Sequence, residues 1–173
     1  PHVLKCEPGQ DPMDPASWRS EGKVRPVAGD PLAFQTFSLD MTYFEAGGKH
    51  YVVWAEKTTG DSLLFISTID PSNPARLTSP ATILSMPEFA WEQVRYNVNE
   101  GAAAIKRDGK IYLCFSAAGT GPEYCIGLLT ADENADLLQR DIWTKNPFPI
   151  LTTQDVDREY GPGHNSFTKD QYG

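Results

Sequence analysis

Short apolar runs separated by glycine and proline fill the chain, and a helical period of apolar positions is nearly absent. Fourteen glycines and fourteen prolines punctuate these runs, which favours short strands joined by turns. The pattern predicts an all-β chain, with one short helical turn expected in a loop at 130–139. The clearest predicted strands are Met41–Glu45, His50–Ala55, Leu63–Ile69, Ala102–Lys106, Ile111–Ser116 and Cys125–Thr130.

The predicted strands recur as a unit of strand, tight turn, strand, gap and third strand. The segment DMTYFEAGGKHYVVWAE is followed by SLLFISTID, and EGAAAIKRDGKIYLCFSA is followed by EYCIGLLTA. Each unit has a Gly-Lys pair between its first two strands, at Gly48 and at Gly109, where glycine allows the positive φ that a hairpin turn needs. A third copy begins at HNSFTKDQYG, in which Gly173 takes the turn position.

The spacing of the turn glycines indicates the architecture. Gly48 and Gly109 are 61 residues apart, and Gly173 follows 64 residues later. A period of this length suits a blade of four antiparallel strands, so we predict a β-propeller. Because a propeller closes with about four to eight blades, the chain would cover about two and a half to three of them. The expected division is the end of a preceding blade at 1–39, blades at 40–99 and 100–163, and the first strand of the next blade at 164–173.

Three ionisable residues open the first strands of the successive units. Asp40 lies 8 residues before the turn glycine of its unit, and Glu100 and His164 each lie 9 residues before theirs. The first strand of a propeller blade is the innermost, so we expect the three side chains to converge at the mouth of the central channel. Two carboxyl groups facing one pocket are typical of glycoside hydrolysis, in which one donates a proton to the leaving oxygen. Taken singly, each of these residues is more often a solvated turn residue or a structural hydrogen bonder.

Net charge and cysteine content argue against several kinds of binding partner and metal site. The formal net charge of −8 argues against nucleic-acid binding, and no apolar run approaches the roughly 20 residues of a membrane helix. Cys6, Cys114 and Cys125 form no metal-type CxxC spacing, and Cys114 is expected to be a buried free thiol. The chain begins with Pro rather than Met, so the residues themselves leave its compartment open.

Three of these segments resemble glycoside hydrolase family 43, the five-bladed propeller arabinanases, arabinofuranosidases and xylosidases. FSLDMTYFEAGGKHYVVWAE resembles the segment with the auxiliary aspartate of that family, and VNEGAAAIKRDGKIYLCFSA resembles the segment with its general acid. YGPGHNSF resembles the segment whose histidine lies in the central channel. Together with GLLTADENADLL, these motifs are most similar to the branch that removes arabinose from α-1,5-arabinan or from side chains.

The resemblance implies a role for each candidate residue. Glu100 would be the general acid and Asp40 the residue that tunes and orients it. His164 would contact substrate or reach a metal through water; no cofactor is required by the family, although Ca²⁺ can occupy the channel. Trp91, in the loop before Glu100, is the best candidate for stacking on a sugar, although core packing is the commoner role of such an aromatic residue. The implied partner is an arabinose-containing oligo- or polysaccharide, and the implied location is outside the cell.

The resemblance also implies an inverting mechanism with an aspartate base on the first blade. Asp11, Asp14 and Asp30 lie too close to Asp40 to stand one blade upstream, so we expect the base to lie outside this chain. Three functions stay open: an arabinose-releasing glycosidase, a catalytically incomplete propeller fragment that at most binds sugar, and a xylosidase of the same family. Fewer than three blades would leave sheet faces uncovered, so we expect the chain alone to aggregate, to oligomerise or to fold only together with the missing blades.

Overall fold

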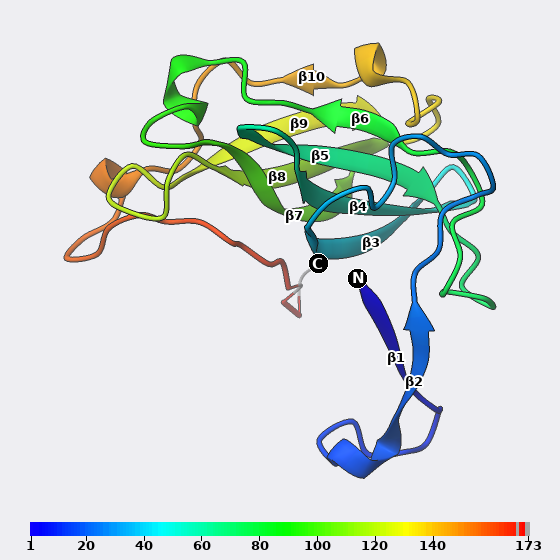
Figure 1. The fold of residues 1–173 in the computed structure, drawn as a ribbon. Helices are drawn as coiled ribbons and strands as arrows, with labels where there is room; N and C mark the ends of the chain where they lie inside the picture. The colour runs from blue at the N-terminus through cyan, green and yellow to red at the C-terminus, as the bar shows by residue number, and fades with distance from the viewer. Residues whose placement is uncertain (169, 172–173) are drawn as a thin grey trace.

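The computed structural model describes residues 1–168, 170 and 171, and it is built from strands with four short 3-10 helices in that part of the chain (Figure 1). The strands are β1 (His2–Cys6), β2 (Trp18–Lys23), β3 (Ser38–Ala46), β4 (Lys49–Lys57), β5 (Asp61–Thr68), β6 (Thr82–Ser85), β7 (Asn97–Arg107), β8 (Lys110–Ala117), β9 (Cys125–Asp132) and β10 (Thr144–Lys145). The 3-10 helices are η1 (Pro15–Ser17), η2 (Ala90–Glu92), η3 (Arg140–Ile142) and η4 (Thr153–Asp155). Within the described residues, no helix has the length and apolar character needed to cross a membrane. The all-β prediction is confirmed.

Two antiparallel units of four strands form the body of the molecule. Strands β3 to β6 make the first unit and β7 to β10 the second, and each strand pairs with the next along the chain. A short parallel pairing joins β5 to β7 where Asp61 faces Asn97 and Ser62 faces Val98. The hairpin of β1 and β2 projects away from these units (Figure 1). The predicted strands of both units are therefore present, while the division of the chain into blades stays a prediction.

Both predicted hairpin turns are confirmed. Gly47 and Gly48 have φ values of 54° and 72°, and Asp108 and Gly109 have values of 50° and 74°. Two consecutive residues with positive φ match the right-handed twist of the flanking strands, which is why Gly is favoured there. The third predicted turn, at Gly173, lies outside the described residues. Of the strand predicted at 164–173, residues 164–168, 170 and 171 are not in a strand.

The helical turn predicted at 130–139 is wrong. Strand β9 continues to Asp132, and the chain then passes through turns to η3. The Asp132 carboxylate accepts a hydrogen bond from the Asn134 backbone N–H at 2.8 Å, and this local bond competes with helix formation. Leu137 is fully buried, and its carbonyl accepts a hydrogen bond from the Trp143 indole N–H. Local capping and burial of one leucine thus outweigh the helix-forming composition of this segment.

Strand β4 is buried on both faces. Tyr51, Val53 and Ala55 pack into a cluster shared by the two four-stranded units, whereas Val52 and Trp54 pack into a second cluster. Such two-sided burial explains why this strand is a continuous apolar run instead of an alternating one. The shared cluster packs the second unit against the first and places β7 in contact with β3, so the first strands of the two units lie side by side.

The cysteines are free thiols, as predicted for Cys114. Cys114 and Cys125 are buried, and Cys6 is half-buried. Burial raises the pKa of the Cys114 thiol, and burial, helped by the charge of Glu92, raises the pKa of Cys125 to about 11. Both buried thiols are therefore neutral at ordinary pH and act as small apolar groups.

Candidate active site

A β-bulge interrupts the first strand of each unit close to its start. The register of β3 against β4 shifts between Leu39 and Thr42, and that of β7 against β8 shifts between Glu100 and Ala103. A bulge adds a residue to one strand and re-aims the neighbouring side chains. In both units the shift lies at the same distance from the hairpin turn, so the two bulges are equivalent features of the repeat.

Within each bulge one residue has a left-handed backbone. This residue is Asp40 in the first unit, with φ of 54°, and Gly101 in the second, with φ of 56°. Asp40 is thus equivalent to Gly101, and Glu100 is equivalent to Leu39. The prediction that Asp40 and Glu100 occupy equivalent positions in the two units is therefore wrong by one residue. Their two positions are successive in the bulge, and a bulge points successive side chains in different directions. The spacings of 8 and 9 residues to the turn glycine already contained this difference.

The two strands nevertheless bring the acidic residues together. The Gly101 backbone N–H donates a hydrogen bond to Asp40 Oδ2 at 3.2 Å, across 61 residues of sequence. The Asp40 carboxylate therefore lies against the residue that follows Glu100. The side chain of Asp40 is 17% exposed, so this carboxylate is largely shielded from water.

His164 completes the predicted group. Its Nε2 lies 3.6 Å from Asp40 Oδ1, and its backbone N–H donates a hydrogen bond to Ser116 Oγ at 2.6 Å. Its ring lies over Gly101, where an added Cβ would come within 3.0 Å of His164 Nδ1. The absence of a side chain at Gly101 thus makes room for the imidazole. The structure brings Asp40, Glu100 and His164 into one neighbourhood, and their chemical roles stay predictions.

Sequence reasoning missed Tyr124, which contacts Glu100 directly. The Tyr124 hydroxyl donates a hydrogen bond to Glu100 Oε1 at 2.8 Å, and the residue is only 8% exposed. Burial raises the pKa of Tyr124 well above its usual value; the Ser116 hydroxyl opposes the rise, whereas Glu100 and Asp40 add to it. The phenol therefore stays protonated and remains a donor. Nothing in the local pattern of EYCIGLLTA distinguishes this tyrosine from a core residue, and only the fold places it here.

The glycines of YGPGHNSF have a steric explanation. A Cβ on Gly163 would lie 2.1 Å from Tyr124 Cε1, and one on Gly161 would lie 2.4 Å from the carbonyl oxygen of Gly121. The backbone at 161–163 therefore runs in direct contact with the Tyr124 ring and with the loop that precedes it. This close approach is possible only without side chains at these two positions, and it delivers His164 to the site.

Glu100 lines a cleft of about 390 Å³ between the two units. Tyr96 lies in the wall of this cleft with 59% of its surface exposed, and the Arg95 guanidinium lies 5.6 Å from the centre of its ring. Asn97 and Asp61 also line it, joined by a hydrogen bond of 2.8 Å. A carboxyl group beside an exposed aromatic ring and several polar side chains is suited to binding a sugar.

Trp91 lies apart from this cleft. Its ring stacks with Phe89 and Phe115, and its indole N–H donates a hydrogen bond to the Pro147 carbonyl at 2.9 Å. It lines a separate cavity of about 270 Å³ that contains none of the ionisable site residues. The predicted role of Trp91 in stacking on a sugar stays a prediction. The aromatic residue that lines the cleft beside Glu100 is Tyr96.

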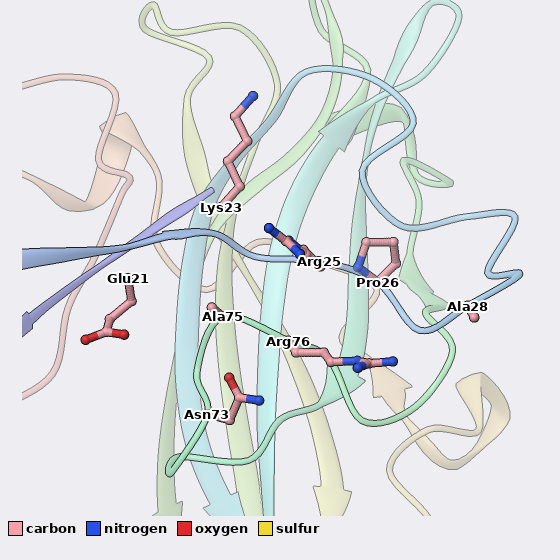
Figure 2. A pocket seen from close by; sticks show the side chains of 8 residues that line it. All are labelled: Glu21, Lys23, Arg25, Pro26, Ala28, Asn73, Ala75 and Arg76. Carbon is pink, nitrogen blue, oxygen red and sulfur yellow. The ribbon is translucent and has the colours of Figure 1, made fainter.

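A larger cleft of about 430 Å³ lies elsewhere (Figure 2). Lys23, Arg25 and Arg76 line it, and Figure 2 shows the side chains of Lys23 and Arg76 pointing in different directions. The Glu100 cleft includes Asp61 at the start of β5, whereas Arg76 follows the end of that strand. The larger cleft is therefore remote from Asp40, Glu100 and His164. We place the candidate site in the smaller cleft because its lining residues include Glu100.

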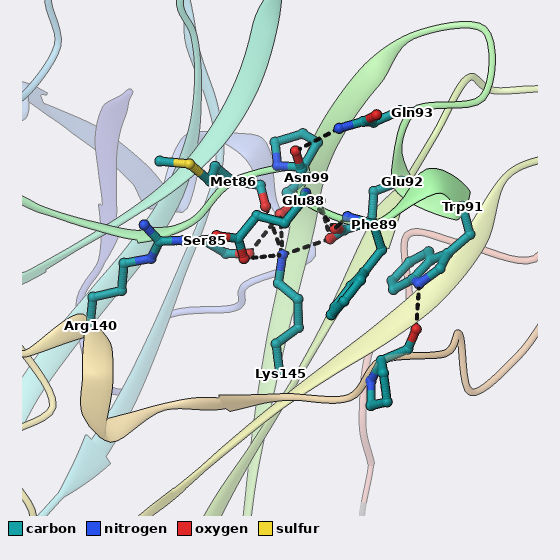
Figure 3. A network of polar contacts seen from close by, with 12 residues as sticks. Ser85, Met86, Glu88, Phe89, Trp91, Glu92, Gln93, Asn99, Arg140 and Lys145 are labelled. Carbon is teal, nitrogen blue, oxygen red and sulfur yellow. Dashed lines mark hydrogen bonds and ion pairs between the residues drawn. The ribbon is translucent and has the colours of Figure 1, made fainter.

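A buried polar network fixes the segment that leads into β7 (Figure 3). The fully buried Glu92 carboxylate accepts hydrogen bonds from the backbone N–H groups of Glu88 and Phe89, at 2.7 and 2.8 Å. It also accepts from Asn99 Nδ2 at 2.9 Å and from Lys145 Nζ at 2.7 Å. Because Asn99 directly precedes Glu100, this network restrains the strand that carries the predicted acid.

The residues near His164 do not form a calcium site by themselves. In the described part of the chain, no three His, Cys, Asp or Glu side chains are grouped so that they could hold a metal. Asp40 is the carboxylate paired with His164, and Asn165 Oδ1 is buried without a hydrogen-bond partner in the described residues. Ca²⁺ takes six to eight oxygen ligands, which these groups do not supply.

Comparison with known proteins gives consistent matches. The family model described as Glycosyl hydrolases family 43 matches residues 4–173. An extracellular exo-alpha-(1->5)-L-arabinofuranosidase from Streptomyces chartreusis is 43% identical over 155 residues, which cover 88% of this chain and 45% of the relative. Alpha-L-arabinofuranosidase B from Pyricularia oryzae is 38% identical over 173 residues, which cover 97% of this chain and 34% of the relative.

A solved structure shows the same arrangement of strands. The crystal structure of alpha-L-arabinofuranosidase from Lactobacillus brevis matches with a TM-score of 0.83 and 40% identity, over 94% of this chain and 49% of that chain. The chain thus spans less than half the length of these relatives. Together with the two four-stranded units, this likeness confirms the β-propeller architecture, of which the chain forms a part.

Proposed function

The chain belongs to the glycosyl hydrolases family 43, and on this basis we propose that the protein releases L-arabinose from α-linked arabinan or from arabinose side chains. The observation that supports this proposal is the position of Glu100 in a cleft, with Asp40 and His164 behind it. The relatives from Streptomyces chartreusis, Pyricularia oryzae and Lactobacillus brevis, all named arabinofuranosidases, support the choice of sugar.

The proposed mechanism is a single displacement with inversion. Glu100 donates its proton to the glycosidic oxygen while a water molecule attacks the anomeric carbon from the opposite face. The water is activated by an aspartate base that we expect on a blade outside this chain. Asp40 orients the acid, because its carboxylate accepts a hydrogen bond of 3.2 Å from the backbone N–H of Gly101, the residue that follows Glu100.

The substrate occupies the cleft that Glu100 lines. The exposed ring of Tyr96 offers a stacking surface, and Asn97, Asp61 and Lys57 offer partners for sugar hydroxyls. The proposed partner is therefore an arabinose-containing oligo- or polysaccharide. We also infer an extracellular location, because the Streptomyces chartreusis relative is named as extracellular.

The test uses the full-length protein with 4-nitrophenyl α-L-arabinofuranoside and with linear arabinan. We expect Glu100→Gln to lower the turnover of arabinan by about 100-fold or more, the contribution of a general acid. Glu21→Gln, in the remote cleft, is the matched control and should leave the rate unchanged. NMR of the first product distinguishes inversion from retention.

Each alternative has its own signature in this assay. Turnover of arabinan that survives Glu100→Gln would refute the assignment of the acid. Release of xylose from xylosides, without release of arabinose, would favour a xylosidase of the same family. Sugar binding without turnover at any pH would favour a non-catalytic propeller.

A further inference from the structure

The two oxygens of the Glu100 carboxyl group have different surroundings. Oε1 accepts a hydrogen bond of 2.8 Å from the Tyr124 hydroxyl. Oε2 accepts no hydrogen bond from the residues that the structure describes, and Glu100 lines the cleft. The buried Tyr124 phenol thus holds one oxygen and leaves the other available to substrate.

We propose that Tyr124 is the positioning residue of the general acid: it holds Glu100 through Oε1, so that Oε2 carries the transferable proton. This inference rests on the proposed function. In the reaction, the attacking water forms a bond to the anomeric carbon and gives a proton to the base, while the bond between that carbon and the glycosidic oxygen breaks and its electron pair stays on the oxygen. As this bond breaks, the proton moves from Glu100 Oε2 to the leaving oxygen, and Glu100 becomes a carboxylate.

The hydrogen bond from Tyr124 strengthens as the proton leaves. Before transfer its acceptor is the carbonyl oxygen of a neutral acid, and afterwards it is a carboxylate oxygen. Hydrogen bonds to ionised acceptors are shorter and roughly twice as strong as those between neutral groups. An interaction that gains strength toward the transition state raises the rate of the chemical step, whereas one of constant strength only improves binding.

The structure holds Tyr124 rigidly in this position. Gly163 lies against its ring so closely that an added Cβ would come within 2.1 Å of Cε1, and the Tyr124 backbone N–H donates to the Gly121 carbonyl at 3.0 Å. The acidic groups that act on the phenol are Glu100 and Asp40, and both disfavour its ionised form. Tyr124 therefore remains a donor throughout the cycle.

A leaving-group comparison separates this role from plain core packing. Activated dinitrophenyl leaving groups depart without protonation, whereas the sugar alcohol of an oligosaccharide needs the acid. In the full-length protein, we expect Tyr124→Phe to lower kcat on arabinotriose by about 10- to 100-fold, the size expected for a hydrogen bond to a charged group, with KM changed little. The same variant should lose less than about threefold on 2,4-dinitrophenyl α-L-arabinofuranoside.

Two controls make the result interpretable. Tyr51→Phe alters another buried tyrosine, which packs on Phe44 in the shared core, and should leave both rates unchanged. Tyr124→3-fluorotyrosine keeps the ring and its O–H donor, so it should retain the rate on arabinotriose and provides a test even if Tyr124→Phe does not fold. Thermal melting of each variant shows whether it is folded.

Each outcome of the leaving-group comparison either supports or overturns the proposal. Selective loss on arabinotriose supports the positioning role. Equal losses on the two substrates, no loss on either, or a 3-fluorotyrosine variant as impaired as Tyr124→Phe would overturn it. An unmodified enzyme that turns over neither substrate overturns the proposed function and, with it, this inference.

Discussion

Replacing Lys145 by methionine should destabilise the protein strongly, because it removes the counter-charge of a buried carboxylate. The Glu92 side chain is 0% exposed and that of Lys145 only 10%, and the two are joined at 2.7 Å (Figure 3). Lys145 also donates a hydrogen bond of 2.7 Å to the Met86 carbonyl. Methionine has a similar volume without the charge, so the change tests the ion pair with little change in packing.

The expected loss of stability in Lys145→Met depends on the hydrogen-bond donors that remain around Glu92. Three donors stay in place, namely the backbone N–H groups of Glu88 and Phe89 and the Asn99 amide. Breaking a buried pair by removing one partner costs about 3–5 kcal/mol, and the three remaining donors suggest the lower end, about 3 kcal/mol. For a domain of about 150–250 residues, that free energy corresponds to a fall in Tm of about 6–12 °C, and a larger domain would show a smaller fall.

The assay is urea unfolding of the full-length protein at constant pH and ionic strength. Arg140→Met is the matched control, because Arg140 pairs with Glu88 at the surface, where the side chains are 40% and 46% exposed. Such an exposed pair is worth about 0–1 kcal/mol. Glu92→Gln should also destabilise, because each carboxylate oxygen accepts from two donors and the new amide N–H₂ would face two of them.

A double-mutant cycle decides whether the pair acts as a unit. The combined Lys145→Met and Glu92→Gln variant should be less destabilised than the sum of the single changes, by about 1–3 kcal/mol. If Lys145→Met costs no more than Arg140→Met, or if the two single effects add within about 0.5 kcal/mol, the reasoning from burial is refuted.

Three further predictions concern single sites. Gly163→Ala should lower stability by about 1–3 kcal/mol in thermal melting, because its Cβ would overlap the Tyr124 ring at 2.1 Å. Burial raises the pKa of the Cys125 thiol from 9.0 to about 11 in the folded protein. The neutral thiol therefore contributes its full stability below pH 9, and this contribution is lost as the pH rises toward 11. Cys125→Ala should accordingly show a smaller fall in Tm between pH 9 and pH 11 than the unmodified protein. Tyr96→Ala should raise KM for arabino-oligosaccharides by about fivefold or more without changing Tm, because the ring is exposed in the cleft.

The sequence predicted those parts of the fold that depend on local pattern. Apolar runs and turn glycines such as Gly48 and Gly109 located the strands and both hairpins, because twist and positive φ are local requirements. The repeat also predicted that Asp40, Glu100 and His164 lie in one neighbourhood, and the structure places them there although His164 is not in a strand.

What sequence reasoning missed depends on contacts between distant residues. Tyr124 lies 24 residues from Glu100, and Lys145 lies 53 residues from Glu92, so no local pattern pairs them. The segment at 130–139 has the composition of a helix, yet the Asp132 side chain bonds to the backbone two residues on. Asp40 is equivalent to Gly101 and not to Glu100, and aligning the two units at their turn glycines did not reveal this offset of one residue.

The backbone at the site gives a separate reason to regard these side chains as functional. Asp40, Gly101 and His164 all have φ between 53° and 56°, a left-handed conformation that costs a non-glycine residue about 1–2 kcal/mol. Glycine is present only at Gly101, where the ring of His164 occupies the space that a side chain would need. At the other two positions glycine would be less strained, yet an aspartate and a histidine stand there with their side chains 3.6 Å apart. Positive φ also occurs at non-glycine residues away from the site, such as Phe34 and Arg158, so strain by itself does not identify a functional residue. What distinguishes Asp40 and His164 is that their strained positions meet beside Glu100, which is the reason to test both side chains for a role in chemistry.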